Sequence, residues 1–369
     1  MSCMTSSTTP SLSQLLGTSV PIHLAPMGGG PSTPELVAAV SAAGGFGWVG
    51  AAYMTPEQIL DHAARVRALT DRPFGINLFA GAWNRQGGGA SEAMLSLLAK
   101  VHEALGIDPP QRAVAPTDPF PLQLEAVLDV RPAMFSFTFG LPRSEDLDRL
   151  RQAGIPIAGT ATTVREARLL AEAGVEAVIA QGAEAGAHRG TFAGAFEQAM
   201  VPTLDLVRDV AGMGLPVIAA GGLMDGADVA AALAAGAEAA ALGTAFLVCP
   251  ESGAAAAHKA AVLSAVPGQT VVTRAFSGRP ARGLPNRFVR EVQVRQIEIP
   301  PYPLQNLMTR PMRTAAAARG AADYLSLWAG TGAHRARALP AAELLRLLET
   351  ERQGAEAAPD ARAEASVQA

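Results

Sequence analysis

Short runs of apolar, β-favouring residues alternate along the chain with longer segments whose apolar positions recur at helical spacing. This alternation is typical of parallel βα units. The predicted strands lie at residues 20–25, 47–50, 74–78, 133–139, 155–160, 177–181, 217–220 and 239–242. Eight strands in succession favour an α/β fold closed as a (β/α)8 TIM barrel over an open sheet.

The pattern changes after Pro250. Predicted helices at 254–263 and within 302–348 flank a β-like run at 270–276 and a stretch rich in Pro, Arg and Gly. We therefore expect a barrel over residues 15–250 and a small, mainly helical C-terminal module over 251–350 that packs on it. Residues 351–369 are rich in Ala and Glu and lack large apolar side chains, which predicts a disordered tail.

Composition supports a large folded chain and excludes some partners. Of the 369 residues, 49% are hydrophobic and 17% are charged, so a sizeable core is expected. A net charge of −4 gives no reason to expect nucleic acid or an anionic membrane as a partner. The longest apolar run, 227–248, is interrupted by Asp228 and Glu238, so we interpret it as helix, turn and strand rather than a membrane span.

Cysteine usage and the first residues bear on the compartment. Cys3 lies in a polar leader and Cys249 in an apolar stretch, so no disulfide framework is expected and a reducing cytoplasm fits. Residues 1–10 have neither a basic residue nor an apolar core, so we do not interpret them as a secretory signal. A cytoplasmic protein is the expectation.

Two glycine turns follow neighbouring strands late in the predicted barrel. Gly221-Gly222 and Gly243-Thr244 each end an apolar strand, one βα unit apart. The loops at these places in barrels often bind phosphate, because backbone N–H groups reach it where no Cβ intrudes. Glycine pairs also fit tight turns, but two turns in this order favour a phosphate site.

His188 is the candidate catalytic residue. It lies in the loop Gln181–Gly190, which follows the sixth predicted strand, and barrel active sites lie at the carboxyl ends of strands. Imidazole suits proton transfer near neutral pH. The alternative is an exposed loop histidine, and position alone does not decide between the two.

The other histidines are assigned structural places. His62, His102 and His258 lie in helical patterns and are expected to be solvated, whereas His23 lies in the first strand and is expected to be a packed core residue. None of them follows a strand end, where barrel chemistry occurs.

Two further strand ends could face a flat ligand. The residues 25–30 after the first strand are small enough for the backbone to run past such a ligand. Asn77 lies near the end of the third strand, where its carboxamide could bond both donor and acceptor atoms of a heterocycle, although a strand-end cap is the alternative. The glycine-rich loop 80–90 is long enough to be a lid or a binding loop. We find no metal-ligand spacing, nucleophile elbow, Walker A pattern or dinucleotide fingerprint.

These motifs together resemble the nitronate monooxygenases, formerly called 2-nitropropane dioxygenases, and their class I most closely. The most specific match is the loop Gln181-Gly-x-Glu-Ala-Gly-x-His188. The other matching segments are Ala25–Met27, Ser41–Gly47, Phe74–Phe79, Phe135–Pro142, Gly221–Gly222 with Asp225–Gly226, and Gly243–Phe246 with Glu251–Ser252.

The resemblance implies an FMN-dependent barrel enzyme. An alkyl nitronate would reduce FMN, by one electron as the resemblance implies. O2 would then complete the conversion to a carbonyl compound and nitrite, with no need for NAD(P)H or a metal. His188 matches the family's catalytic histidine, which acts as a base when a neutral nitroalkane is taken, and Tyr302 lies in a segment that resembles the substrate side. The family's FMN contacts fall on Ala25, Met27, Asn77, Gln181, Gly186, Gly222, Gly243 and Thr244.

Three positions depart from the family pattern. Ala241 stands where relatives often have glutamine, so its FMN contact is expected to come from the backbone or to be lost. Ala187 replaces a frequent glycine, and Thr331 replaces an expected glutamine. These departures leave the phosphate turns and His188 in place and bear on the identity of the substrate.

Two other functions stay open on the sequence. A flavin-dependent enoyl-thioester reductase would share the barrel, FMN and a similar histidine loop, and would need NAD(P)H. A flavin-storing or flavin-sensing protein would bind FMN without turnover. The resemblance also leaves room for a homodimer.

Overall fold

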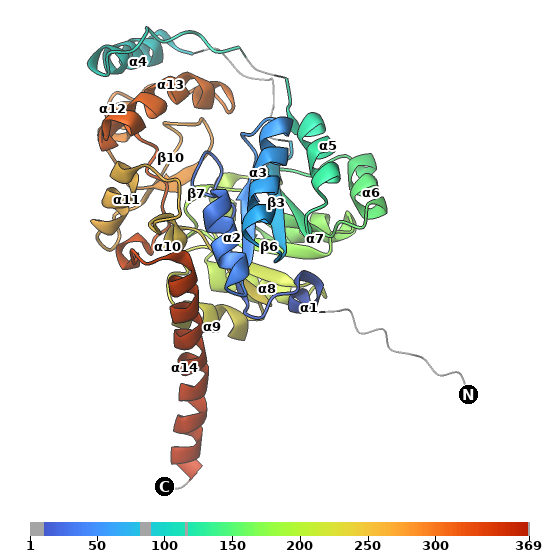
Figure 1. Ribbon diagram of the computed structural model, residues 1–369. Helices are drawn as coiled ribbons and strands as arrows, with labels where there is room; N and C mark the ends of the chain where they lie inside the picture. The colour runs from blue at the N-terminus through green and yellow to red at the C-terminus, as the bar shows by residue number, and fades with distance from the viewer. Residues whose placement is uncertain (1–10, 82–89, 115–116, 368–369) are drawn as a thin grey trace.

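The computed structural model describes residues 11–81, 90–114 and 117–367, and the side chains of 358–367 are not considered. Within these residues, eight parallel strands close into a barrel, as the sequence predicts (Figure 1). Pairing of β1 with β9, with Leu24 opposite Leu242, completes the ring. The strands are β1 (Ile22–Leu24), β2 (Phe46–Gly50), β3 (Phe74–Phe79), β4 (Met134–Thr138), β5 (Ile157–Ala161), β6 (Ala177–Gln181), β8 (Val217–Ala220) and β9 (Ala239–Leu242).

Helices cover the outside of the barrel. Local signals place their starts: Thr33 and Thr55 each cap a helix that has proline at its first position. Their apolar stripes pack on the strands and form the main core. These helices are α2 (Pro34–Ala42), α3 (Pro56–Leu69), α5 (Phe120–Val130), α6 (Ser144–Gln152), α7 (Val164–Glu172), α8 (Thr203–Ala211) and α9 (Gly226–Ala234), whereas α4 (Glu92–Ala104) packs away from the barrel.

Large side chains fill the interior of the barrel at its amino end. Phe46 and Trp48 of β2 are fully buried there. The short helix α1 (Leu12–Leu16), which the sequence pattern did not reveal, closes this end with Leu12 and Leu16. It is held by a capping box at Ser11 and by the Leu12 N–H, which donates to the Glu238 carboxylate at 2.7 Å. The open end of the barrel is therefore the carboxyl end.

The C-terminal residues form a second, mainly helical layer beside the barrel mouth (Figure 1). A small antiparallel sheet joins it to the barrel, because β11 pairs with β7, the two-residue strand that holds His188. Helix α4 shares a buried apolar cluster with this layer, through Met94, Leu97 and Leu98. The elements are β7 (Ala187–His188), α10 (Thr244–Leu247), α11 (Ala256–Leu263), β10 (Val271–Thr273), β11 (Ala281–Gly283), α12 (Arg287–Val294), α13 (Leu304–Arg319) and α14 (Ala341–Val367).

The predicted disordered tail is wrong in this structure, because residues 351–367 continue the helix α14, which runs away from the barrel (Figure 1). Ala, Glu and Arg are strong helix formers. Arg352 pairs with Glu349 and Glu356 along one face of the helix, and Glu351 pairs with Arg337. The lack of large apolar residues therefore marked an exposed helix rather than disorder.

Three histidines are buried where solvation was expected: His62 is 8% exposed, His102 2% and His258 9%. Helical spacing placed each one on a helix but could not show which neighbouring segment covers it. His23 is packed in the core, as expected, with its ring 5.2 Å from that of Phe46.

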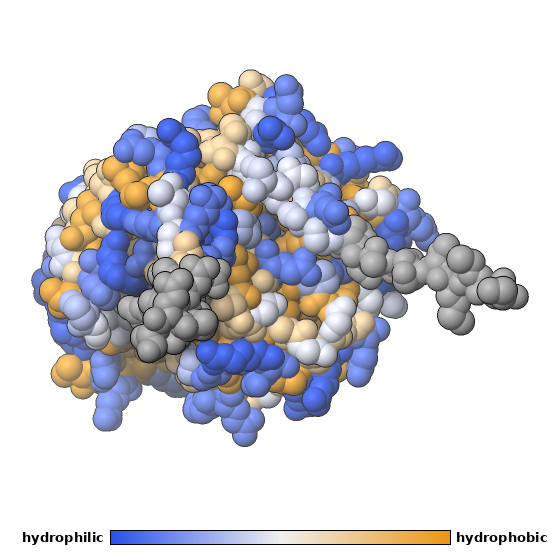
Figure 2. Space-filling view, turned by 90° about the horizontal axis from the view of Figure 1, so that it is seen from below, coloured by the Kyte–Doolittle hydropathy of each residue, from blue (hydrophilic) through white to orange (hydrophobic). Residues whose placement is uncertain are grey.

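Two remaining observations concern the outside of the molecule. Hydrophilic side chains interrupt the apolar ones across the face that Figure 2 shows, and no helix within the described residues is long and apolar enough to cross a membrane. The predicted glycine-rich loop 80–90 falls mostly on residues 82–89, which lie outside the described residues.

Candidate active site

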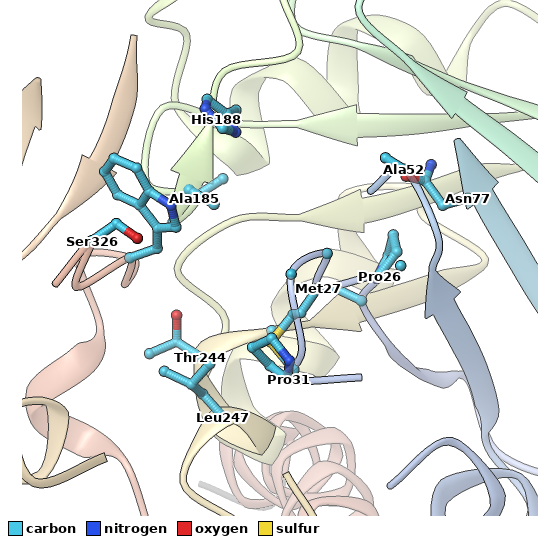
Figure 3. Close-up of a pocket in the computed structure, with 18 of the residues that line it drawn as sticks. Pro26, Met27, Pro31, Ala52, Asn77, Ala185, His188, Thr244, Leu247 and Ser326 are labelled. Atoms are coloured by element: carbon cyan, nitrogen blue, oxygen red, sulfur yellow. The ribbon is translucent and has the colours of Figure 1, made fainter. Parts of the chain in front are cut away.

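A cavity of about 720 Å³ opens at the carboxyl ends of the barrel strands and extends under the C-terminal layer. His188, Asn77 and Thr244 face it from different sides (Figure 3). Its size is typical of a site for a cofactor or a small substrate. Ten of the residues singled out from the sequence line it: Ala25, Met27, Asn77, Gln181, Gly186, His188, Gly222, Ala241, Gly243 and Thr244.

The cavity exists because the upper layer of the barrel is made of small side chains. Ala25, Ala220 and Ala241 occupy interior positions above the bulky layer of Phe46 and Trp48. Position 241 thus offers a methyl group rather than a polar side chain, so any polar contact from it must come from the backbone.

The two predicted phosphate turns present unused backbone donors to the cavity. Within the described residues, the N–H groups of Gly222, Gly243 and Thr244 donate to no protein acceptor. The Thr244 hydroxyl oxygen accepts from the Gly330 N–H at 2.9 Å, which leaves its own hydrogen free to donate. A phosphate group is the kind of acceptor that such a set of donors fits.

Gly222 and Gly243 lack a side chain for different structural reasons. Gly222 has φ of 72°, and a Cβ there would lie 2.7 Å from the Glu184 Cβ, so the fold itself requires glycine. At Gly243 a Cβ would make only ordinary contacts, 3.7 Å from the Ala25 Cβ and 3.9 Å from the Met27 Sδ. Glycine at position 243 therefore keeps the cavity open and is not required for packing of the protein.

Asn77 and Gln181 play different parts in the wall. The Asn77 amide nitrogen donates to the Ser136 hydroxyl at 2.9 Å, and its side-chain carbonyl is free of that bond. Gln181, in contrast, donates to the His188 carbonyl at 3.0 Å and accepts from the Gly190 N–H at 2.8 Å. Although Gln181 lines the cavity, both ends of its carboxamide hold the backbone of the histidine loop.

His188 is held in one orientation by Ser277. Its Nε2 lies 2.8 Å from the Ser277 Oγ, and the Ser277 hydroxyl donates its hydrogen to the Arg279 carbonyl at 3.1 Å. The serine oxygen must then accept from Nε2–H, which leaves Nδ1 as the unprotonated ring nitrogen. Burial, together with the charges of Arg279 and Arg313, lowers the pKa of His188 to about 3. The imidazole is therefore a neutral proton acceptor at physiological pH.

Four aromatic rings surround the imidazole of His188. The ring centroids of Phe79, Phe139, Tyr302 and Trp328 lie between 5.7 and 6.3 Å from that of His188. Tyr302, the predicted substrate residue, packs behind His188 and is not among the described residues that line the cavity. Its phenol is hydrogen-bonded to that of Tyr53, which does line the cavity.

The lining has a positive potential. Arg310 and Arg313 are among the described lining residues, whereas no Asp or Glu is. Arg313 donates to the Asn306 carbonyl at 2.8 Å and to its side-chain oxygen at 2.9 Å, while its buried Nε has no hydrogen-bond partner within the described residues. Such a cavity favours an anionic ligand.

Sequence reasoning missed Tyr53, Phe139, Ser277 and Arg313. Ser277 lies just after the β-like run at 270–276, but nothing local in the sequence shows that this run folds against the histidine loop. The pairing of β7 with β11, which sets Ala281 opposite His188, brings Ser277 to the site.

A (β/α)8 barrel with two open glycine turns and a neutral histidine around one cavity is typical of an enzyme whose site can hold a phosphate-bearing ligand. The chain matches the family model described as nitronate monooxygenase over residues 9–351. The chain therefore belongs to the nitronate monooxygenase family, whose members are flavin-dependent oxidoreductases.

Individual relatives agree with this assignment. The chain is 43% identical over 351 residues to a nitronate monooxygenase of Pseudomonas aeruginosa, with 94% of this chain and 100% of the relative covered. Its fold is similar to that of nitroalkane oxidase from Streptomyces ansochromogenes, with a TM-score of 0.84, 42% identity, and 92% and 98% of the two chains covered. FabK from Thermotoga maritima is less similar, with a TM-score of 0.75, 28% identity, and 97% and 100% covered.

Proposed function

We propose that the protein binds FMN in this cavity and oxidises alkyl nitronates with O2 to carbonyl compounds and nitrite. The observation that carries the proposal is the joint position of the phosphate turns and His188 on one cavity that has arginines but no carboxylates in its described lining. The family assignment supports the same reaction. The enoyl-thioester reductase alternative has weaker support, because the FabK likeness is lower in identity and TM-score.

The described residues fit FMN. The free N–H groups of Gly222, Gly243 and Thr244 would hold its phosphate, and Ala25 and Met27 would lie along its flat ring system. The Asn77 side-chain carbonyl would accept from a ring N–H. When bound, FMN supplies an electron acceptor for the nitronate and a route for the electrons to O2.

The protein's own groups prepare the substrate. Arg313 and Arg310 favour binding of the anionic nitronate over the neutral nitroalkane. When a neutral nitroalkane enters, Nδ1 of His188 accepts the proton from the carbon next to the nitro group, and the hydrogen bond from Nε2 to Ser277 fixes the ring for this transfer. The surrounding aromatic rings keep water from the reacting carbon.

Anaerobic mixing tests the proposal. The FMN-loaded protein is mixed with ethyl nitronate, and separately with NADH and NADPH, while the flavin absorbance is followed. Bleaching by the nitronate alone, with nitrite formed once O2 is admitted, supports the proposal. Bleaching by NAD(P)H with turnover of an enoyl thioester supports the reductase instead. Bound FMN that no substrate reduces supports a flavin-binding protein.

A further inference from the structure

Phe139 has a backbone conformation that bulky residues rarely adopt. It follows β4 directly and has φ of 85°, in the region that favours glycine. A residue held in this way persists only where the surrounding structure fixes it, and such residues concentrate at functional sites. The positive φ of Phe139 therefore indicates a role in the active site rather than in β4.

Contacts with Arg279 and Phe79 hold the ring. The Arg279 guanidinium lies over the Phe139 ring, with Cζ 3.8 Å from the ring centroid. Arg279 is itself fixed, because it donates to the carbonyls of Arg189 and Thr191. Phe139 also meets Phe79, with ring centroids 4.3 Å apart. With only 3% of the residue exposed, the ring has no free space into which it could turn.

The ring forms part of the cavity wall beside His188, with centroids 5.7 Å apart. Within the described residues, Phe139 and Tyr302 form a buried cluster with Phe79 that is separate from the larger apolar clusters. Phe139 therefore contributes little to the main cores. Because its ring lies against His188, it limits the space that is available to the substrate.

We propose that Phe139 is a specificity-determining residue, which limits the length of the alkyl chain that can lie beside His188. This inference rests on the proposed function. Because the ring is fixed by its backbone and by Arg279, a longer chain cannot displace it at small cost, so the wall selects short nitronates.

The test compares Phe139→Gly and Phe139→Ala with the wild type over linear nitronates from ethyl to hexyl. We expect the ratio of kcat/KM for hexyl to that for ethyl nitronate to rise by about tenfold or more in both variants, since a single methylene in a pocket changes specificity by roughly 10–200-fold. The matched control is Phe137→Leu, two residues earlier in β4 and fully buried in the barrel core. An unchanged ratio at position 139, or an equal rise in the control, overturns the proposal.

A second measurement tests the conformation without any turnover. Alanine normally stabilises a protein relative to glycine, but at positive φ the order reverses. Phe139→Gly should therefore unfold at a higher temperature than Phe139→Ala, and the opposite order would contradict a strained backbone at this position.

Failure of the proposed function can be distinguished from failure of the size limit set by Phe139. If the wild type oxidises no nitronate, the same size limit is measured as dissociation constants for linear carboxylates from acetate to octanoate. Trp48 and Trp328 line the cavity and report binding by fluorescence. Octanoate should bind at least about tenfold more tightly to Phe139→Gly than to the wild type, and equal binding would overturn the size limit.

Discussion

The Nε2 atom of His188 lies 2.8 Å from the hydroxyl oxygen of Ser277, a residue 89 positions further along the chain. This bond selects the ring nitrogen that can accept a proton. It also makes the reactive histidine dependent on a segment outside the barrel.

Replacing Ser277 by alanine should impair proton abstraction more than nitronate oxidation. Without the acceptor for Nε2–H, the ring loses its fixed tautomer and orientation. We expect kcat with neutral nitroethane to fall by about tenfold or more, because positioned general bases contribute roughly 10²–10⁴-fold. Oxygen consumption measures both rates. Ser326→Ala, another hydroxyl on the cavity, is the control, and an equal loss on ethyl nitronate would contradict a positioning role.

His188→Asn should slow the turnover of nitroethane far more than that of ethyl nitronate. Nitroethane turnover should drop by about two orders of magnitude or more, while ethyl nitronate, which has already lost its proton, should still be oxidised. Because the pKa of His188 is lowered to about 3, the wild-type kcat/KM for nitroethane should show no histidine inflection between about pH 5 and 7. A sigmoidal rise centred near pH 6.5 would mean that His188 titrates like an exposed imidazole.

Gly243→Ala should remove the cofactor and spare the fold. The added Cβ meets only ordinary protein contacts but enters the cavity beside Met27. We expect FMN affinity to fall by about tenfold or more, since a phosphate held by backbone N–H groups needs close approach. Flavin fluorescence gives the dissociation constant and thermal unfolding the stability. Gly212→Ala, where a Cβ meets nothing within 4 Å, should change neither.

Arg313→Gln should raise KM for ethyl nitronate by about tenfold, with a smaller effect on kcat, if the arginine binds the anion in the ground and transition states alike. Steady-state kinetics over a range of nitronate concentrations give both constants. Arg319→Gln is the matched control, because Arg319 is an exposed arginine of the same helix that is not among the described lining residues. A loss confined to kcat would place Arg313 in the chemical step instead.

Acid should destabilise the protein through its buried histidines. Burial lowers the pKa of His23 to about 3 and that of His62 to about 4. Between these values and about 6.5 the unfolded chain binds more protons than the folded one, so the unfolding free energy falls as the pH drops, by up to about 1.4 kcal/mol per pH unit for each group. Urea unfolding from pH 7.5 to 5 should show a smaller dependence of the unfolding free energy on pH for His23→Leu than for the wild type, and an unchanged dependence would contradict this account.

The barrel could be predicted because its signals are local. Each strand and helix has its own periodicity and caps, and the order of strand ends placed Asn77, His188, Gly222 and Gly243 around one opening. What the sequence did not reveal depends on contacts between distant segments. Ser277 and Arg313 face His188 only because the C-terminal layer folds over the barrel mouth, and Phe139 reaches it through a positive φ that strand periodicity does not predict. Burial of His62 and His102 was likewise set by neighbours that periodicity does not identify.

Local reasoning was incomplete in two places. The composition of residues 351–369 predicted disorder, but Arg352 and its glutamates support a long exposed helix. Gln181 stays a predicted FMN contact, and the structure adds that its carboxamide bonds the backbone of His188 and Gly190, which the motif alone did not reveal.

Pairing of β7 with β11 brings the C-terminal layer to the histidine loop, so the two parts of the chain contribute different groups to one site. The glycine turns belong to the barrel, whereas the bond that orients His188 and the cavity arginines come from residues after 270. We expect sequence changes around Ser277 and Arg313 to alter which compounds react more than they alter cofactor binding. An engineer who wants a new substrate should therefore change this layer, together with Phe139 just after β4, and leave the glycine turns untouched.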